Sequence, residues 1–303
     1  MRVLDQLIVR ALPAVPRRVV ALVSAPYIAG ATLGDARRTV ARLNAEGKLA
    51  TVDVLGEEVT RPAEAEAIGA AYRSVVQAIV DDGLDASVSV KLTALGLEID
   101  PDLCRSLLTG VVADASRRGI FVRIDMEGSR WTDATLRLYR ELREAGQDGV
   151  GIVLQSALRR SVADAQALAD LRPNVRLCKG IYVEPEAIAY QRGDEVRKSF
   201  LHLLDVLLAG GSYVALATHD EWLLGRSLER VAGLVPAEYE LQFLLGVRER
   251  RASELVAAGH RLRVYVPYGD RWYEYSLRRL QENPSLATTI ARATLARLVP
   301  RRG

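Results

Sequence analysis

The sequence predicts a (β/α)8 barrel, because eight short apolar runs alternate with amphipathic helical stretches along the chain. Its 303 residues suit one large α/β domain, and a hydrophobic share of 49% is enough to fill an extensive core. No low-complexity linker divides the chain. We therefore expect one barrel domain over residues 47–303, preceded by a helical segment over residues 1–46.

The expected strands are short and rich in aliphatic and β-branched residues, whereas the stretches between them repeat apolar residues at helical spacing. In chain order the strands are expected at residues 49–55, 86–92, 121–126, 151–155, 175–179, 212–217, 240–243 and 262–266. The clearest helices are expected at residues 63–81, 101–118, 133–145 and 161–171, with an earlier one at 32–44. In such a barrel the functional residues lie at the C-terminal ends of the strands.

Several other protein classes fit the sequence poorly. A doubly wound dinucleotide-binding sheet needs a glycine-rich loop after its first strand, but here that strand ends in Asp53-Val-Leu-Gly56-Glu-Glu, without GxGxxG. Three scattered histidines, without HExxH or CxxC, argue against a metal centre, and no GxSxG elbow is present. Asp125 and Glu127 lie too close along one strand to predict a glycosidase pair. A net charge of +3 does not call for a nucleic-acid partner.

The sequence also bears on the cellular compartment. Cys104 and Cys178 show no disulfide or metal-ligand spacing, which fits a reducing environment. Prolines and charges interrupt the apolar N-terminal stretch, so it reads neither as a signal peptide nor as a membrane span. We expect a cytoplasmic protein, with that stretch and the arginine-rich C-terminal tail available for peripheral contact with the inner face of a membrane.

Polar residues lie at or just after the C-terminal ends of the predicted strands, where a barrel has its mouth. These strand-end residues are Lys91, Asp125, Gln155, Lys179, His219 and Tyr265. Each has an ordinary structural reading: a solvated lysine, a carboxylate paired with Arg123 or Arg130, a core amide, a structural histidine. Burying so many polar groups at one mouth costs free energy unless the groups are paired or bind a ligand. They favour a site for an anionic cofactor together with a small anionic substrate.

A C-terminal stretch adds a carboxylate-binding pattern. If residues 275–283 are helical, Tyr275, Arg278, Arg279 and Glu282 share one face, at spacings i, i+3, i+4 and i+7. Two neighbouring guanidiniums can bind a carboxylate in bidentate fashion. The alternative is a solvated charged face. We expect this helix to cover the barrel mouth.

Six strings in this order resemble the flavin-dependent proline dehydrogenases in their monofunctional form. They are Val90-Lys91-Leu-Thr, Ile124-Asp125-Met-Glu127, Val175-Arg176-Leu-Cys-Lys179-Gly180-Ile-Tyr182, Ala217-Thr218-His219, Tyr265-Val-Pro-Tyr-Gly269 and Tyr275-x-x-Arg278-Arg279-x-x-Glu282-Asn283. The resemblance runs from Tyr27 to Asn283 and implies a (β/α)8 barrel preceded by helices, with FAD at the strand C-termini.

The resemblance implies roles for individual residues around the substrate. Arg278 and Arg279 resemble the pair that grips the proline carboxylate, with Lys91 as a further partner and Glu282 holding the arginines. The remaining residues would surround the pyrrolidine ring or act on it. Tyr265, Tyr275 and Leu177 would be its walls, Leu244 would add an apolar contact, and Asp125 would be an acid beside it.

The same resemblance implies a set of cofactor-binding residues. Arg176 would approach the flavin N5, and Gln155 would contact the flavin ring with Met126 beside it. The others would hold the rest of the cofactor: Lys179, Gly180 and Ile181 along its length, and Thr218 and His219 on the adenosine side.

The implied reaction is oxidation of L-proline to Δ1-pyrroline-5-carboxylate by hydride transfer to FAD, the first step of proline catabolism to glutamate. A quinone electron acceptor at the membrane and a separate pyrroline-5-carboxylate (glutamate semialdehyde) dehydrogenase are the implied partners. Two alternatives stay open: a flavoenzyme for another cyclic imino acid such as hydroxyproline, and a non-catalytic barrel that senses an amino acid.

Overall fold

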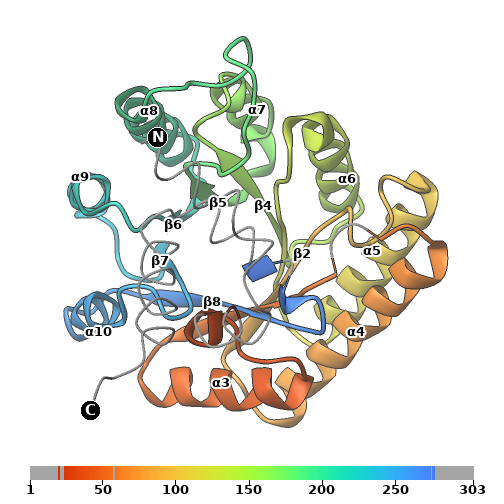
Figure 1. Ribbon diagram of the computed structural model, residues 1–303. Coiled ribbons are helices and arrows are strands. Elements are labelled where there is room, and N and C mark those ends of the chain that lie inside the picture. Colours follow the sequence, from red (N-terminus) through yellow and green to blue (C-terminus); the bar gives the residue numbers. More distant parts are fainter. Residues whose placement is uncertain (1–19, 21–23, 57–58, 274, 277–303) are drawn as a thin grey trace, which may run out of the picture.

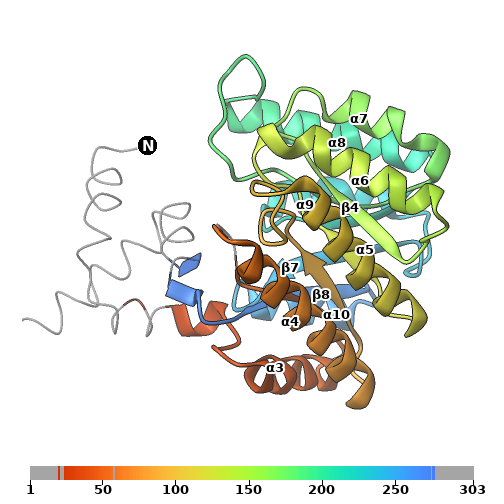
Figure 2. The same cartoon turned by 90° about the vertical axis from the view of Figure 1, so that its right-hand side faces the viewer.

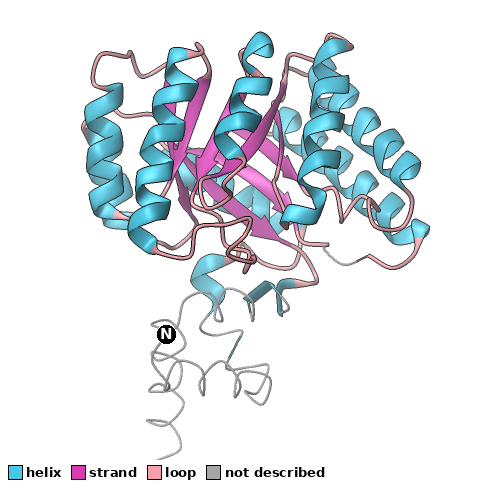
Figure 3. Cartoon of the chain, turned by 90° about the horizontal axis from the view of Figure 1, so that it is seen from above, coloured by secondary structure: helices cyan, strands magenta, loops and turns pink. Residues whose placement is uncertain are grey.

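The chain folds into a closed barrel of eight parallel strands in the order β1 to β8, which confirms the fold class predicted from the sequence (Figure 1). The computed structural model describes residues 20, 24–56, 59–273, 275 and 276. Helices surround the strands on the outside, and Figure 3 shows the strands enclosed by this helical shell.

The eight observed strands begin and end within two residues of the predicted ones. They are β1 Leu49–Val54, β2 Ala86–Val90, β3 Val122–Ile124, β4 Val150–Gln155, β5 Asn174–Cys178, β6 Tyr213–Ala217, β7 Tyr239–Leu244 and β8 Leu262–Tyr268. The ladder of β8 runs two residues further than expected because the carbonyl of Tyr268 accepts a hydrogen bond from the amide of Leu55, at 2.9 Å.

The helices include the five expected from the sequence, α3 to α7, close to their predicted positions. They are α3 Leu33–Ala45, α4 Pro62–Asp81, α5 Pro101–Arg117, α6 Thr132–Glu144, α7 Ser161–Ala167, α8 Gly193–Ala209, α9 Glu221–Val231 and α10 Glu249–Ala257. Short 3-10 turns are η2 Ala25–Tyr27, η3 Ser129–Trp131 and η4 Ala169–Leu171, so the helix expected at 161–171 divides into α7 and η4. Proline begins α4 and α5, where its missing N–H costs nothing.

Helix α3 closes the shell over the two ends of the strand order. It follows a capping box in which Thr32 and Asp35 satisfy each other's backbone amides. Its buried residues Ala36, Val40 and Leu43 pack toward β1 and β8, and it lies between α4 and α10 (Figure 1, Figure 2). A helix that precedes the barrel therefore covers the seam where β8 meets β1. The boundary at residue 46 stays a prediction, and the expected helix over the mouth, residues 277–283 in particular, lies outside the described residues.

The two faces of the strands differ sharply in chemistry. Outward side chains are aliphatic and lie in one continuous core with the helices; Val88, Ile124 and Ile152 have no exposed surface at all. Inward positions are mostly polar, because the register aligns Asp53 with Ser89, and Ser89 with Arg123. A barrel lumen is ordinarily filled with bulky branched side chains. Here it is filled with paired charges.

One glycine makes this charged filling possible on β4. A Cβ at Gly151 would stand 2.5 Å from Nη1 of Arg123 and 2.6 Å from the carbonyl oxygen of Asn174. Without that Cβ, Nη1 of Arg123 donates to the carbonyls of Asn174, at 2.5 Å, and Ile152, at 2.9 Å.

Within the described ranges, no helix has the length and hydropathy to cross a bilayer.

Candidate active site

A chain of hydrogen bonds links four strands at the C-terminal end of the lumen. Lys91, just after β2, donates to Asp53 Oδ2 at 2.7 Å and to the Tyr265 hydroxyl at 3.0 Å. Tyr265 on β8 donates in turn to Asp125 Oδ2, at 2.9 Å, just after β3. Asp53 is fully buried and also accepts from the Tyr72 hydroxyl, which reaches in from α4 at 3.3 Å. Strand alternation and register thus bring together groups that are far apart in sequence.

Arg176 on β5 completes this network from the opposite wall. Its Nη1 donates to Asp125 Oδ1 and, at 3.1 Å, to the Ser89 hydroxyl, which itself donates to Asp125 Oδ1 at 2.8 Å. Its Nε donates to Gln242 Oε1 at 2.5 Å, and its guanidinium lies 5.2 Å from the centre of the Tyr265 ring. Asp125 is therefore oriented by three donors, and Arg176 is a buried cation with a fixed direction.

Electrostatics keep the lysine and the phenol of this network protonated. Burial by itself would lower the pKa of Lys91, but the charge of adjacent Asp53, together with Tyr265 and Asp125, outweighs burial and raises that pKa well above its usual value. Burial, with the Asp125 charge adding to it, raises the pKa of Tyr265. Lys91 is thus a charged ammonium at neutral pH, and Tyr265 remains a hydroxyl donor.

A second ionic layer lies deeper in the barrel, and sequence reasoning did not predict it. Glu240 on β7 pairs with Arg263 on β8, with Nε to carboxylate distances of 2.9 and 3.1 Å. Arg263 Nη1 also donates to the carbonyl of Ala50, at 2.7 Å, and Gln242 donates to Glu240. The alternation of polar and apolar residues along the strands could have predicted this layer, because Glu240, Gln242 and Arg263 occupy every second position of otherwise apolar strands.

The rim over β3 to β5 carries three of the predicted cofactor-binding residues. Gln155 Nε2 donates to the carbonyls of Met126 and Glu127, both at 3.1 Å, which leaves its Oε1 facing Gly180. Gly180 has a φ of +97°, and a Cβ there would come within 3.1 Å of that oxygen. The position therefore requires glycine, and its bare backbone can closely approach a ligand. Met126 is buried beside it.

The rim over β5 to β7 is basic and well ordered by Asp220. Lys179 donates to Asp220 at 3.0 Å, and Arg197 from α8 donates to it at 2.8 and 3.1 Å. His219 Nε2 accepts a hydrogen bond from the backbone amide of Leu244 at 3.0 Å, so this nitrogen carries no proton. Thr218, which precedes His219, is buried, and its hydroxyl accepts from the amide of Asp220.

Of the other predicted residues, the structure turns Leu177 away from the lumen and places Ile181 and Tyr275 beyond the ends of their strands. Leu177 is fully buried in the hydrophobic core; because neighbouring Arg176 faces the lumen, alternation places Leu177 on the outer face of β5. Ile181 lies in the loop after β5 with 57% of its surface exposed. Tyr275 is buried against Ile28 and Leu55. Arg278, Arg279 and Glu282 lie outside the described residues.

The ordinary structural readings of the carboxylates do not hold. Asp125 pairs with Arg176 and approaches Lys91 at 3.8 Å, whereas Arg130 pairs with Glu98. Glu127 instead accepts hydrogen bonds from the amide and hydroxyl of Thr93. Asp53 and Ser89, which sequence reasoning assigned no role, belong to the network as firmly as the predicted residues, and so does Gln242, which the sequence places only among the polar groups at the strand ends.

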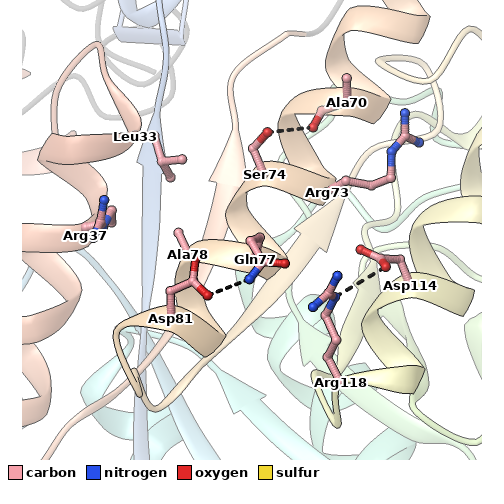
Figure 4. A pocket seen from close by; sticks show the side chains of 10 residues that line it. All are labelled: Leu33, Arg37, Ala70, Arg73, Ser74, Gln77, Ala78, Asp81, Asp114 and Arg118. Atoms are coloured by element: carbon pink, nitrogen blue, oxygen red, sulfur yellow. Dashed lines mark hydrogen bonds and ion pairs between the residues drawn. The ribbon is translucent and has the colours of Figure 1, made fainter.

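A surface groove lies on the far side of the strand wall and is separate from this network. It runs between α3, α4 and α5, and Figure 4 shows Arg37, Arg73 and Arg118 projecting around it. Its polar groups largely satisfy one another, as in the Gln77–Asp81 and Arg118–Asp114 contacts. The buried charges and Gly180, with its positive φ, are at the mouth, and we place the active site there.

A family model described as "Proline dehydrogenase" matches residues 36–292 of this chain. The chain belongs to the proline dehydrogenase family. Proline dehydrogenase 1 of Bacillus subtilis subsp. natto is 37% identical over 273 residues, which cover 89% of both chains. Proline dehydrogenase of Deinococcus radiodurans is 34% identical over 275 residues, again with 89% of both covered. The resemblance drawn from the sequence motifs is confirmed.

Solved structures agree with the fold. The proline utilization A protein (PutA) of Bdellovibrio bacteriovorus, inactivated by N-propargylglycine, superposes with a TM-score of 0.80 at 24% identity. The match covers 86% of this chain and 33% of that protein, so this chain spans about a third of its length. At this identity the likeness concerns the barrel alone.

Members of the proline dehydrogenase family are flavin-dependent oxidoreductases, and the residues at the mouth of this barrel suit a flavin cofactor. Arg176 supplies a buried, oriented cation, Gly180 an open backbone next to the Gln155 amide, and Lys179 with Arg197 a basic rim. A ring that gains negative charge on reduction, joined to an anionic chain, needs donors and cations of this kind.

Proposed function

We propose that the barrel mouth binds L-proline and FAD side by side and oxidises L-proline to Δ1-pyrroline-5-carboxylate. Proline oxidation, the first step of proline catabolism, is the activity of this family. The observation that carries the assignment to this site is the network in which Lys91, Asp125 and Arg176 are held at one end of the lumen. Bound FAD supplies the hydride acceptor, and the protein supplies position and charge.

The substrate-binding residues of the proposal are cationic and aromatic. Lys91, kept charged by Asp53, attracts the proline carboxylate together with Arg278 and Arg279, which Glu282 holds in place. Tyr265 and Tyr275 flank the pyrrolidine ring, with Leu244 as an apolar contact. Leu177 does not contribute to the substrate site, because its side chain faces the helical shell. Asp125 is an oriented carboxylate near the ring nitrogen, the atom that must be unprotonated before its neighbouring carbon gives up a hydride.

The cofactor-binding residues of the proposal line the β3 to β6 rim. Arg176 places its positive charge where negative charge develops on reduction, and Gln155 and Met126 bound the same space. Lys179, Gly180 and Ile181 contact the cofactor along its length. Thr218 and His219 hold its adenosine side. This set supports FAD, because it extends over several strands beyond the region that a flavin ring occupies.

We propose two partners beyond proline itself. The electron acceptor is a quinone reached at the inner face of the membrane, where the arginine-rich tail can meet anionic lipid. The product, after hydrolysis to glutamate semialdehyde, passes to a separate dehydrogenase. Sedimentation of the cytoplasmic protein with anionic vesicles, compared with neutral ones, tests the first partner, and no difference between the two would contradict it.

Anaerobic mixing of the purified protein with L-proline tests the assignment. We expect a yellow protein whose flavin absorbance bleaches with proline and whose acid-released cofactor is FAD. Preferential bleaching by trans-4-hydroxyproline would instead favour another imino acid, and unbleached flavin would favour a sensor. Arg278→Met and Arg279→Met should each raise KM for proline steeply, by about 100-fold for loss of a charge-assisted pair, while FAD stays bound. An unchanged KM in either variant would remove the arginine pair from the site.

A further inference from the structure

The side chain of Gln242 connects the two ionic layers of the lumen. Its Oε1 accepts from Arg176 Nε at 2.5 Å in the upper layer, and its Nε2 donates to Glu240 Oε1 in the lower one. Gln242 and Glu240 are both nearly fully buried, at 6% and 3% exposure. Nothing in the proposed chemistry requires Gln242 to touch substrate, so its place between the two layers calls for another explanation.

The chemistry of its neighbours permits only one orientation of this amide. A guanidinium can donate and never accept, so Gln242 must turn its oxygen toward Arg176. A carboxylate in an ion pair can only accept, so the amide nitrogen must face Glu240. The O and N ends of an amide look alike by shape, but here the charges on either side distinguish them.

Arg263 in turn keeps Glu240 ionised and in place. The carboxylate is held by two contacts of 2.9 and 3.1 Å from Arg263 Nε. Burial opposes ionisation of Glu240, but the charge and hydrogen bonds of Arg263, together with the Gln242 hydrogen bond and the Arg123 charge, outweigh burial and keep the pKa of Glu240 below its usual value. The acceptor that orients Gln242 is therefore a permanent charge at neutral pH.

The contact from Gln242 restricts the orientation of the Arg176 guanidinium. A planar guanidinium on a long side chain can turn about the Cδ–Nε bond and the bonds before it, and contacts on Nη1 alone would leave that rotation partly open. The second contact, at Nε, closes it. With both in place, Arg176 keeps Nη1 on Asp125 and Ser89 and its face beside Tyr265, at 5.2 Å.

We propose that Gln242, itself oriented by the Glu240–Arg263 pair, is a positioning residue that fixes the Arg176 guanidinium for the reaction. This inference rests on the proposed function, since it gives Arg176 its place beside the flavin. In this arrangement the deep ionic layer is a support for the catalytic one. It explains why the barrel retains Glu240, Gln242 and Arg263 at interior positions, where well-packed apolar residues would cost less free energy to bury.

The test is a double-mutant cycle between Gln242→Met and Arg176→Met, read in three measurements: kcat and KM for proline, and the midpoint potential of the bound flavin. Methionine matches glutamine in length and removes both hydrogen bonds. We expect Gln242→Met to lower kcat about tenfold with KM within about threefold, and to shift the flavin potential to more negative values as the cation loses its place. In the Arg176→Met background the same change should add nothing further.

Full additivity of the two substitutions, or an unchanged potential in Gln242→Met, would overturn the proposal. Val153→Ala, at an apolar lumen position in register with Arg176, is the matched control and should lower only thermal stability. If Gln242→Met does not fold, Glu240→Gln carries the same test, because it removes the charge that dictates the amide orientation. A wild-type flavin that proline does not reduce would instead reject the proposed function, and the two failures are thereby distinct.

Discussion

The inner and outer faces of the same eight strands perform different tasks. Ile152 and Val153 are neighbours on β4, yet Ile152 packs into the aliphatic layer under the helices, whereas Val153 is in register with Arg176 inside the barrel. The outer face stabilises the fold through buried apolar area. The inner face carries charges that are costly to bury and persist because each is paired. Substitutions on the two faces should therefore separate stability from activity.

The largest expected effect is on the inner face. Arg176→Met should lower kcat/KM for proline about 100- to 1,000-fold, as losing a preorganised charge at a reacting centre does elsewhere. Asp125 loses a buried ionic partner but keeps its contacts to Ser89 and Tyr265 and has Lys91 at 3.8 Å, so thermal stability should also fall, though by less than the activity. Steady-state kinetics and thermal unfolding measure the two quantities. Arg159→Met, at an arginine that stacks on the Tyr190 ring outside the lumen, is the control; an equal loss of activity there would contradict the prediction.

The outer face should show the opposite pattern. Ile152→Ala removes three carbons from a side chain with no exposed surface and should lower the free energy of unfolding by about 2–5 kcal/mol. KM for proline should stay within about twofold of wild type, because the Ile152 side chain faces the helices and the substitution keeps the backbone carbonyl that Arg123 contacts. Urea unfolding followed by circular dichroism gives the first value and kinetics the second. A large rise in KM with unaltered stability would show that the two faces are not independent.

A pH-dependent effect is expected at the rim, where the two faces meet. Burial opposes ionisation of Asp220, but hydrogen bonds from Arg197 and Lys179 outweigh it and lower the pKa from 3.8 to about 2. A depressed pKa means that the stabilisation is present above pH 4 and is lost as pH falls toward 2. Asp220→Asn should therefore cost about 1–2 kcal/mol at pH 7, after allowance for solvent around both cations, and progressively less as the pH falls toward 2.

Thermal unfolding from pH 7 down to pH 2 measures the effect at Asp220. Asp194→Asn, which removes an exposed carboxylate from the same helical rim, is the control and should give a much smaller difference at every pH. A stability difference between wild type and Asp220→Asn that did not change with pH would show that its charge is not the cause.

The smallest expected effect is a gain. Thr51 points into the lumen in register with Tyr265, and within the described part of the chain its buried hydroxyl oxygen has no hydrogen-bond partner. Thr51→Val replaces that hydroxyl with a methyl of similar size and should raise the free energy of unfolding by about 1 kcal/mol. Loss of stability would mean that the hydroxyl makes a contact in solution. Ser227→Ala, at a second unpaired buried hydroxyl on α9, offers a parallel measurement.

The sequence predicted the barrel well because apolar residues repeat with different periods in strands and in helices. Eight alternations between the two patterns are typical of a (β/α)8 topology. Boundaries shifted by one or two residues where backbone hydrogen bonds continued past the apolar run, as at Tyr268. Among site residues, Lys91, Asp125, Arg176 and Tyr265 could be proposed because they lie in or just after strands, within recognisable strings. Leu177 illustrates the limit, since a residue adjacent to a functional one in sequence points the other way in a strand.

By itself, the sequence determined the alternation of strands and helices, the family, and the residue types gathered at one end of the barrel. These are local or short-range properties, and periodicity and motif order record them directly. The tertiary structure alone decided which charges meet. Asp53 reaches Lys91, Arg176 reaches Gln242, and Glu240 reaches Arg263 only because parallel register places strands remote in sequence around one lumen. Distances of a few ångströms across that lumen depend on barrel closure, which no stretch of the chain encodes alone.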